Sequence, residues 1–221
     1  MNKKLTIIGA VVLFLLILDQ VVKIYIKTSF DSDEVRYVIG NWFALHYIEN
    51  QGMAFGTTFG SEIWHKLALS IFRVIAICGL AYYIVREAKK GASLEFLIVI
   101  GFIFAGATGN LLDSMFYDFA FDFNPCEGFN QLPKSGVKMM CKDYGFSYPV
   151  EVRHKGFLLG NVVDMFQFDV NWPSWVPYVG GKQIFPLIWN IADACITLGV
   201  FAIIIRQKKY FPKEKVTETE G

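Results

Sequence analysis

Two carboxylates in the C-terminal half of the chain have the type and placement that acid–base chemistry requires. Asp193 stands inside residues 185–205, a run of 21 mostly apolar residues that is long enough to cross a bilayer as a helix. Asn190 lies three residues earlier, on the same face of that predicted helix. An ionisable side chain at membrane depth costs roughly 2.5–3.5 kcal/mol on insertion scales, so it marks a functional site. The second carboxylate, Asp164, lies upstream in residues 160–166, and we expect the two acids to meet at the outer membrane boundary.

Two carboxylates held close together do not both ionise readily, so one pKa rises and the two groups share a proton. The ionised group can then activate a water molecule while the protonated group polarises a carbonyl, which is the arrangement of aspartic proteases. Helix packing and ion binding remain open as alternative roles for the two acids. Serine hydrolysis would need a Gly-x-Ser-x-Gly elbow and zinc hydrolysis a His-Glu-x-x-His motif, and the sequence contains neither.

The composition is that of a membrane protein. Of the 221 residues, 54% are hydrophobic and 19% charged, whereas soluble domains average about 45–50% and about 25%. The excess lies in four apolar blocks, so we predict a mainly α membrane protein with a bundle of four transmembrane helices in a single domain over residues 1–221. The blocks lie at about residues 5–27, 64–85, 94–114 and 184–206. A net charge of +1 provides no basic surface for nucleic acid.

The distribution of basic residues predicts the topology. Lys and Arg gather at the N-terminus, after the second apolar block and after the fourth, and the positive-inside rule places all three clusters in the cytoplasm. The basic tail at residues 207–221 is then cytoplasmic, and residues 28–62 and 117–182 lie outside. Within the first outer segment, two β-prone runs flank Gly40 and Asn41, which predicts a small β-hairpin or cradle at the membrane surface.

The second outer segment is too long to be a plain connection, which indicates that it is folded or functional. Its aromatic residues Trp172, Trp175 and Tyr178 fit an interfacial belt, so we expect part of the segment to lie on the membrane. The segment also holds Cys126 and Cys141, whose spacing differs from the short Cys pairs of zinc sites. Outside the cytoplasm these cysteines could form a disulfide, and free thiols are the open alternative.

Further polar residues converge on the same boundary. Asn110 and Asp113 lie three apart at the end of the third apolar block, on one helical face. Asn50 and Gly52 lie in a Gly-containing loop after the predicted hairpin, where glycine permits close approach of the backbone to a ligand or to neighbouring structure.

The first apolar block carries its own charges. Asp19 and Lys23 stand four residues apart and therefore face each other on a helix. A structural ion pair near the interface and contact with a substrate are both open. The sequence has no Gly-rich phosphate loop and no pattern typical of a metal site, so we predict neither cofactor nor metal.

The polar residues fall in four short blocks, which read NQGMAFG at residues 50–56, GNLLD at 109–113, GNVVDMF at 160–166 and WNIADACI at 189–196. In their order, and in their spacing relative to four apolar segments, these blocks resemble those of lipoprotein signal peptidase (signal peptidase II). The acid and the lysine on the first apolar block agree with the same family. The resemblance covers most of the chain.

The resemblance implies a bacterial inner-membrane aspartyl endopeptidase that removes signal peptides from prolipoproteins just before a diacylglyceryl-modified cysteine. Asp164 and Asp193 match its catalytic pair. Positions that shape the site or bind substrate are matched by Asp19, Lys23, Asn50, Gly52, Asn110, Asp113 and Asn190. The resemblance also implies a monomer among membrane lipids, with cytoplasmic termini and a periplasm-facing site, which binds globomycin-type peptide inhibitors.

The chain departs from the family pattern in two places. The block around Asp113 usually continues with an arginine that contacts substrate, whereas this chain has Ser114. That arginine is either missing or replaced by another residue such as Arg153. The insertion at about residues 118–157 is also longer than the usual loop, which affects lid structure and substrate recognition rather than the two acids.

Two other classes of function are open alternatives. A small ion-coupled transporter or channel could relay protons through Asp19, Lys23 and Asp193. Such a protein would spread its acids across the bilayer depth, whereas this chain is predicted to hold them in the outer half. A non-catalytic envelope assembly protein would tolerate replacement of both Asp164 and Asp193.

Overall fold

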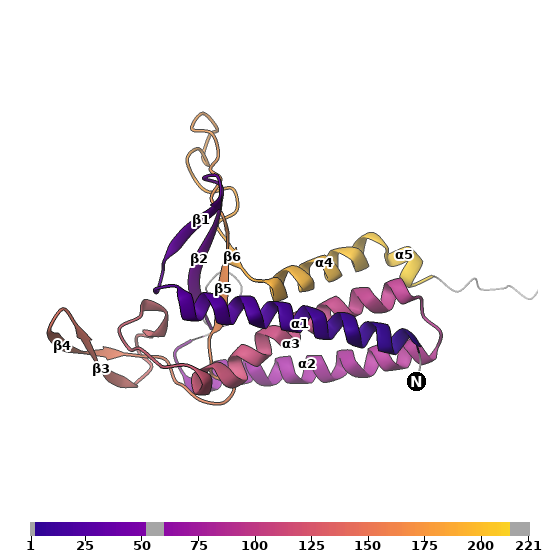
Figure 1. Cartoon of the computed structure of the whole chain (residues 1–221), viewed down its shortest axis with the longest axis horizontal. Helices are drawn as coiled ribbons and strands as arrows, with labels where there is room; N and C mark the ends of the chain where they lie inside the picture. The colour runs from indigo at the N-terminus through magenta and orange to yellow at the C-terminus, as the bar shows by residue number, and fades with distance from the viewer. Residues whose placement is uncertain (1–2, 52–59, 213–221) are drawn as a thin grey trace, which may run out of the picture.

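The computed structural model describes residues 3–51 and 60–212. Its longest elements are three apolar helices of 27 residues each, which by length and composition could cross a membrane, and a fourth apolar helix is shorter. These helices are α1 (Lys3–Ser29), α2 (Ile63–Lys89), α3 (Leu94–Ala120) and α4 (Ile191–Ile205), and a short helix, α5 (Gln207–Tyr210), follows. They form one elongated bundle (Figure 1). The predicted class, a mainly helical membrane protein with a small sheet, is confirmed.

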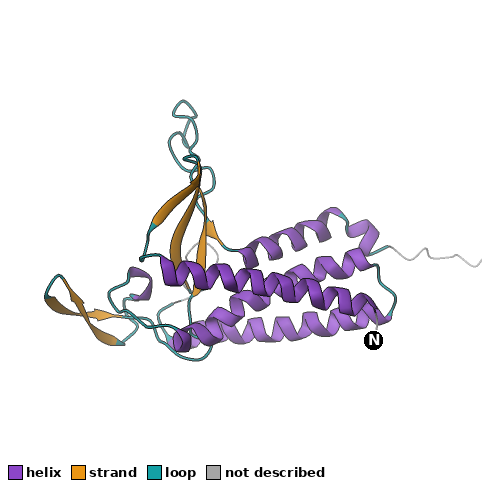
Figure 2. Ribbon diagram, viewed as in Figure 1, coloured by secondary structure: helices purple, strands orange, loops and turns teal. Residues whose placement is uncertain are grey.

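Helix α3 is the centre of the bundle, because it packs against α1, α2 and α4 (Figure 2). Glycine makes two of these contacts close. Gly101 of α3 lies against Ile8 of α1, and a Cβ on Gly106 would stand 2.2 Å from the carbonyl oxygen of Ala192 in α4. Small residues at such crossings let two membrane helices approach at backbone distance.

A four-stranded antiparallel sheet stands at the end of the bundle opposite to the N-terminus and runs at a steep angle to the helices (Figure 1). In spatial order its strands are β1 (Val35–Ile39), β2 (Phe43–Asn50), β5 (Val162–Phe168) and β6 (Ile188–Trp189). Val163 and Met165 of β5 pack with Ile26 of α1 and Tyr117 of α3 in one buried cluster. The sheet is thereby fixed to the ends of α1 and α3.

The long insertion is folded. Its strands β3 (Lys138–Asp143) and β4 (Phe146–Glu151) form a separate antiparallel pair, and a disulfide joins Cys126 to Cys141. Between these two cysteines in the sequence lies the short 3-10 helix η2 (Gly128–Asn130). Phe129 of η2 packs on Tyr47 of β2 with ring centroids 5.6 Å apart. The insertion therefore supports the sheet from the side.

The predicted helix over residues 184–206 is wrong at its start. The structure begins α4 at Ile191, because Asn190 caps it: the Asn190 side chain accepts from the Asp193 N–H, and the Asp193 side chain accepts from the Asn190 N–H. The preceding residues, Ile188–Trp189, pair with β5 as strand β6. Asn190 therefore precedes the helix and does not share a helical face with Asp193.

The third helix also differs from its predicted range of residues 94–114. Helix α3 continues to Ala120. Residues 115–120 contain neither glycine nor proline, so nothing in the sequence breaks the helix there, and Tyr117 is buried against the sheet.

The close contact between α3 and α4 yields a first prediction. We expect Gly106→Ala to lower the free energy of unfolding by about 1–3 kcal/mol, because the added Cβ must push the Ala192 carbonyl away. Thermal unfolding in detergent measures the change. The matched control is Gly79→Ala in α2, where the added Cβ meets no described atom within 4 Å. Equal unfolding midpoints for the two variants would contradict the prediction.

Candidate active site

The two predicted acids come together where the sheet meets α4. Asp164 lies in the middle of β5, and strand alternation turns it to the side opposite from the buried Val163 and Met165. Asp193 is the third residue of α4. Asp164 is almost fully buried, at 2% exposed, whereas Asp193 is half-buried. The accessible side of this acid pair is therefore at Asp193.

Asn190 connects the two carboxyl groups. Its side-chain Nδ2 donates to Oδ1 of Asp164 at 2.6 Å, and its side-chain oxygen accepts from the backbone N–H of Asp193 at 2.9 Å. Its own backbone N–H donates to Oδ2 of Asp193 at 3.3 Å. One residue therefore sets the relative placement of both acids.

Two further asparagine side chains complete the contacts to the acids. Asn50, at the end of β2, donates from Nδ2 to Oδ2 of Asp164. Asn110 of α3 donates from Nδ2 to Oδ1 of Asp193 at 2.9 Å. Its Oδ1 accepts from Asn190 at 3.2 Å. All four carboxyl oxygens of the acid pair thus accept a hydrogen bond from an N–H group.

Behind these asparagines lies a buried ion cluster around Lys23, whose side chain has no exposed surface. The Lys23 ammonium is 3.0 Å from Oδ2 of Asp19 and 2.9 Å from Oδ2 of Asp113. It also donates to Oδ1 of Asn110 at 2.9 Å. A buried charge is stable only with such compensation. The cluster therefore ties α1 to α3 and fixes the orientation of the Asn110 amide.

Each carboxylate of the cluster also holds the backbone next to one of the two acids. Oδ1 of Asp19 accepts from the backbone N–H of Ala192 at 2.9 Å, one residue before Asp193. Oδ2 of Asp113 accepts from the backbone N–H of Val163 at 3.3 Å, one residue before Asp164. The Lys23 ammonium group therefore helps to position both β5 and the first turn of α4, through Asp113 and Asp19.

The environment of Asp164 disfavours its charged form. Burial, and next the charge of Asp193, raise the pKa of the Asp164 carboxyl well above its usual range. The Lys23 ammonium and the hydrogen bond from Asn190 act in the opposite direction. The surroundings of Asp164 therefore favour its neutral form.

The structure brings nearly all of the predicted site residues into one connected network. Its members are Asp19, Lys23, Asn50, Asn110, Asp113, Asp164, Asn190 and Asp193. Gly52, the remaining prediction, lies outside the described residues. Among the described residues, no group of three or more His, Cys, Asp or Glu side chains is arranged to hold a metal ion.

The sequence analysis missed Gln20 and Tyr117. The Gln20 amide donates to Oδ2 of Asp19 at 3.2 Å and to Oδ1 of Asp113 at 2.9 Å, so it also joins the two carboxylates that surround Lys23. The Tyr117 hydroxyl donates to Oε1 of Gln20 at 3.1 Å. The sequence marks Gln20 only as an amide next to Asp19 in a mostly apolar helix.

Arg153, the suggested replacement for the family's substrate-contacting arginine, is bound to other groups of the protein. The Arg153 guanidinium binds both carboxyl oxygens of Asp118, at 2.7 and 3.0 Å, and donates from Nε to Asn130 at 3.0 Å. These contacts tie Arg153 to the end of α3 and to the insertion. Ser114 itself is fully buried, and its carbonyl accepts from the Gly160 N–H at 3.0 Å.

Comparison with known proteins gives the same picture. A family model described as signal peptidase (SPase) II matches residues 11–208. The chain is 33% identical over 206 residues to a lipoprotein signal peptidase of Porphyromonas gingivalis, covering 90% of this chain and 81% of that protein. It is 30% identical over 230 residues to a lipoprotein signal peptidase of Amoebophilus asiaticus, covering 100% of this chain and 86% of that protein.

Two solved structures, both described as a bacterial membrane enzyme, share the fold. One has 22% identity and a TM-score of 0.59, covering 97% of this chain and 95% of that one. The other has 24% identity and a TM-score of 0.56, covering 92% and 94%. The similarity in sequence to the curated relatives, which extends along nearly the whole chain, decides the family. The chain belongs to the signal peptidase II family, the proteases that remove signal peptides from prolipoproteins.

Proposed function

We propose that Asp164 and Asp193 form the catalytic dyad and that the enzyme cleaves its precursors immediately before a diacylglyceryl-modified cysteine. The observation that carries the proposal is the Asn190 bridge, which contacts both carboxyl groups although they lie on different elements. The two alternatives from the sequence, an ion-coupled transporter and a non-catalytic assembly protein, lose their support because the family is one of proteases.

In the proposed mechanism the two acids share one proton. Asp164 carries it, because it is the more deeply buried of the two acids and burial raises the pKa of its carboxyl. Asp193 is ionised, and its place in the first turn of α4 favours negative charge. Asp193 takes a proton from a water molecule whose oxygen attacks the scissile carbonyl carbon, while the Asp164 proton moves to the carbonyl oxygen. The intermediate then collapses: Asp164 recovers its proton, and the leaving amine takes the proton held by Asp193.

We propose that Asn50, Asn110 and Asn190 hold the dyad in this geometry, and that Asp19, Lys23 and Asp113 act one step further away as positioning residues. Asp19, Lys23 and Asp113 are buried behind Asn110, which itself contacts Asp193. Their hydrogen bonds reach the dyad through Asn110 and through the backbone beside each acid.

We propose four membrane crossings with both termini in the cytoplasm. The cytoplasmic ends of the helices are joined, since Lys4 donates to the Ala92 carbonyl at 2.6 Å and Arg206 lies 2.9 Å from Glu95. The 15 residues of α4 rise about 22 Å, less than the roughly 30 Å hydrocarbon core. The dyad then lies just inside the outer boundary and faces the periplasm. We propose that the enzyme acts as a monomer. The lipid chains of the substrate are held against the apolar helices, and a globomycin-type inhibitor binds in the same place.

Removal of either acid tests the dyad. We expect Asp164→Asn and Asp193→Asn each to slow cleavage by at least about 100-fold, because neither variant can share a proton between two carboxyl groups. A gel-shift assay with a lipidated prolipoprotein measures the rate, and mass spectrometry of the product measures the cleavage position. The matched control is Asp169→Asn, just beyond the end of β5, which should cleave normally. Wild-type turnover by either dyad variant would refute the assignment.

The dyad also predicts a dependence of stability on pH. The folded enzyme retains a proton on Asp164 that the unfolded chain loses above about pH 4. Wild-type stability therefore falls as pH rises from there to the folded-state pKa. Asp164→Asn removes this loss, so we expect its thermal midpoint to exceed that of wild type, by a margin that grows with pH across this range.

Asp169 provides a control of opposite sign. The Tyr37 hydroxyl, which donates to it at 2.5 Å, lowers the pKa of the Asp169 carboxyl. Its charge therefore stabilises the fold at neutral pH, and Asp169→Asn should be no more stable than wild type. Thermal scans of both variants at pH 5 and pH 8 measure the difference. An Asp164→Asn protein less stable than wild type at pH 8 would count against the raised pKa of the Asp164 carboxyl.

The ion cluster yields a prediction about Lys23. We expect Lys23→Met to lower the free energy of unfolding by about 3–5 kcal/mol and to suppress cleavage, because it leaves Asp19 and Asp113 buried without a counter-charge. The matched control is Lys90→Met, because Lys90 forms a surface ion pair with Glu87 at 3.1 Å. Loss of this pair should lower the free energy of unfolding by no more than about 1 kcal/mol. Similar midpoints for both variants would refute the role of the cluster.

A further inference from the structure

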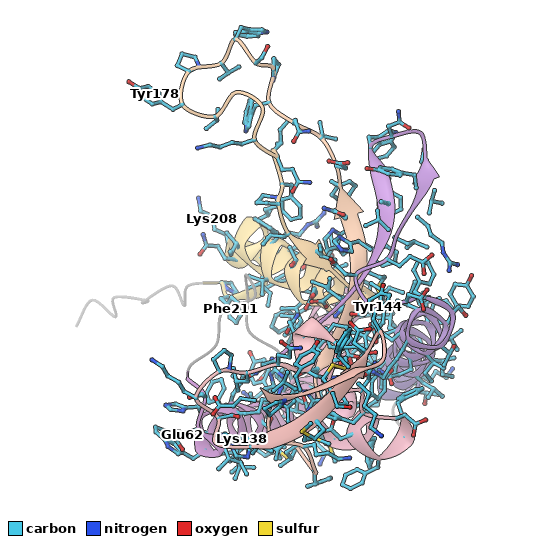
Figure 3. The ribbon with its side chains drawn as sticks, turned by 90° about the vertical axis from the view of Figure 1, so that its left-hand side faces the viewer. Glu62, Lys138, Tyr144, Tyr178, Lys208 and Phe211 are labelled. Atoms are coloured by element: carbon cyan, nitrogen blue, oxygen red, sulfur yellow. A yellow bond between two sulfur atoms is a disulfide. The ribbon has the colours of Figure 1, made fainter. Side chains whose placement is uncertain are left out.

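Two exposed aromatic segments extend from the bundle, and they point in different directions. The first is the connection between β5 and β6, residues 170–185, here named the rim loop; in it Trp175 is 80% and Tyr178 96% exposed. The second is the tip of the β3–β4 hairpin, where Tyr144 is 94% exposed. In Figure 1 the hairpin extends roughly along the helix direction, whereas the rim loop lies at the far end of the sheet, to the side of the bundle. Figure 3 shows Tyr178 and Tyr144 well apart.

The rim loop is an ordered element. Its neck is closed by backbone hydrogen bonds, from Trp172 N–H to the Lys182 carbonyl at 2.9 Å and from Ile184 N–H to the Val170 carbonyl at 2.7 Å. Further bonds of this kind cross the loop, including Gly181 N–H to the Trp172 carbonyl at 2.9 Å. These backbone groups are paired within the loop, while the side chains of Trp175 and Tyr178 are exposed. An apolar surface of this kind can enter a lipid interface without leaving those backbone groups unpaired.

The composition of the rim loop fits the same environment. Lys182 is its only charged residue, and it carries two tryptophans and a tyrosine, the residue types that gather at membrane–water interfaces. The loop is also tied to the sheet through aromatic packing. Phe185 packs on Phe168 of β5 with ring centroids 6.1 Å apart. The position of the loop therefore constrains the position of β5, the strand that carries Asp164.

The depth of the rim loop follows from the short α4. Strand β6 directly precedes Asn190, so the sheet leaves the bundle at the level of the α4 N-terminus. That level is about 22 Å above the cytoplasmic helix ends, within a hydrocarbon core of roughly 30 Å. Because the sheet runs at a steep angle to the helices (Figure 1), its far end stays near the outer interface and does not rise into water. This step rests on the membrane topology in the proposed function.

We propose that the rim loop inserts Trp175 and Tyr178 into the outer leaflet of the surrounding bilayer, while the β3–β4 hairpin stays in water. The sheet that carries Asp164 is then held at two places, by the bundle on one side and by lipid on the other. The partner is a lipid surface, because the loop extends sideways at interfacial depth. The two outcomes that would assign another partner are burial against a second copy of the chain and burial against another protein.

Spin-label accessibility tests the proposal directly. The free cysteines Cys78 and Cys195 are replaced by alanine, and the cleavage activity of this background is checked. Single labels are then placed with Trp175→Cys, Tyr178→Cys and, as the matched exposed control, Tyr144→Cys. The proteins are reconstituted in nanodiscs of phosphatidylethanolamine and phosphatidylglycerol. Oxygen reports exposure to lipid, and a water-soluble nickel chelate reports exposure to water.

We expect the ratio of oxygen to nickel accessibility to be several-fold higher at positions 175 and 178 than at position 144. Equal ratios at all three positions would overturn the proposal. Low accessibility to both reagents at positions 175 and 178 would also overturn it, because the loop would then be covered by protein. The readout does not depend on turnover, so it can fail while the catalytic dyad stands, and the dyad can fail while the loop is in lipid.

An activity measurement adds an independent arm. The double variant Trp175→Ser/Tyr178→Ser should cleave a lipidated precursor several-fold more slowly than wild type in nanodiscs, and at the wild-type rate in detergent, where no leaflet positions the sheet. Tyr144→Ser should match wild type in both. A double variant that cleaves at the wild-type rate in nanodiscs, or equally slowly in both media, would refute the contribution of the loop.

Discussion

The geometry of the site depends on one buried ammonium group. Lys23 has no exposed side-chain surface, and two carboxylates and an amide oxygen surround it. A buried cation is stable only while these partners stay within hydrogen-bonding distance. The contact between Lys23 of α1 and Asp113 of α3 therefore fixes the spacing of the two helices. Because Asp19 and Asp113 also hold the backbone beside each acid, the same constraint sets where the two acids lie. The two acids are therefore positioned by electrostatics rather than by apolar packing alone.

The two acids differ in environment, although both are aspartates. Asp164 stands on a strand between two neighbouring strands and is almost fully enclosed, which favours its neutral form. Asp193 is half-buried in the first turn of a helix, where backbone N–H groups favour negative charge. Asn190 contacts both and belongs to both elements, since it follows β6 and caps α4. The proposed roles of Asp164 as acid and Asp193 as base rest on this difference in burial.

The sequence was informative where polar residues interrupt apolar runs. Asp19, Lys23 and Asp113 could be selected because charge in a membrane helix needs an explanation, and the class of the fold followed from the apolar blocks. The start of α4 could not be predicted from hydrophobicity, since Ile188 and Trp189 suit a helix and a strand equally, and only pairing with β5 decides between them. Gln20 and the Arg153–Asp118 ion pair were missed for a related reason: their partners lie far away in sequence.

The late start of α4 is what allows strand β6 and Asp193 to lie at the same level of the bundle. A helix beginning at residue 184 would satisfy its own backbone and leave no free N–H groups beside Asp193. Starting at Ile191 instead exposes the first-turn N–H groups, and irregular backbone at membrane depth is tolerated only where protein supplies partners. Here Asn190 caps the Asp193 N–H and Asp19 accepts from the Ala192 N–H, while β6 pairs with β5. The short helix, the ion cluster around Lys23 and the sheet therefore depend on one another, because each supplies the partners that the others lack.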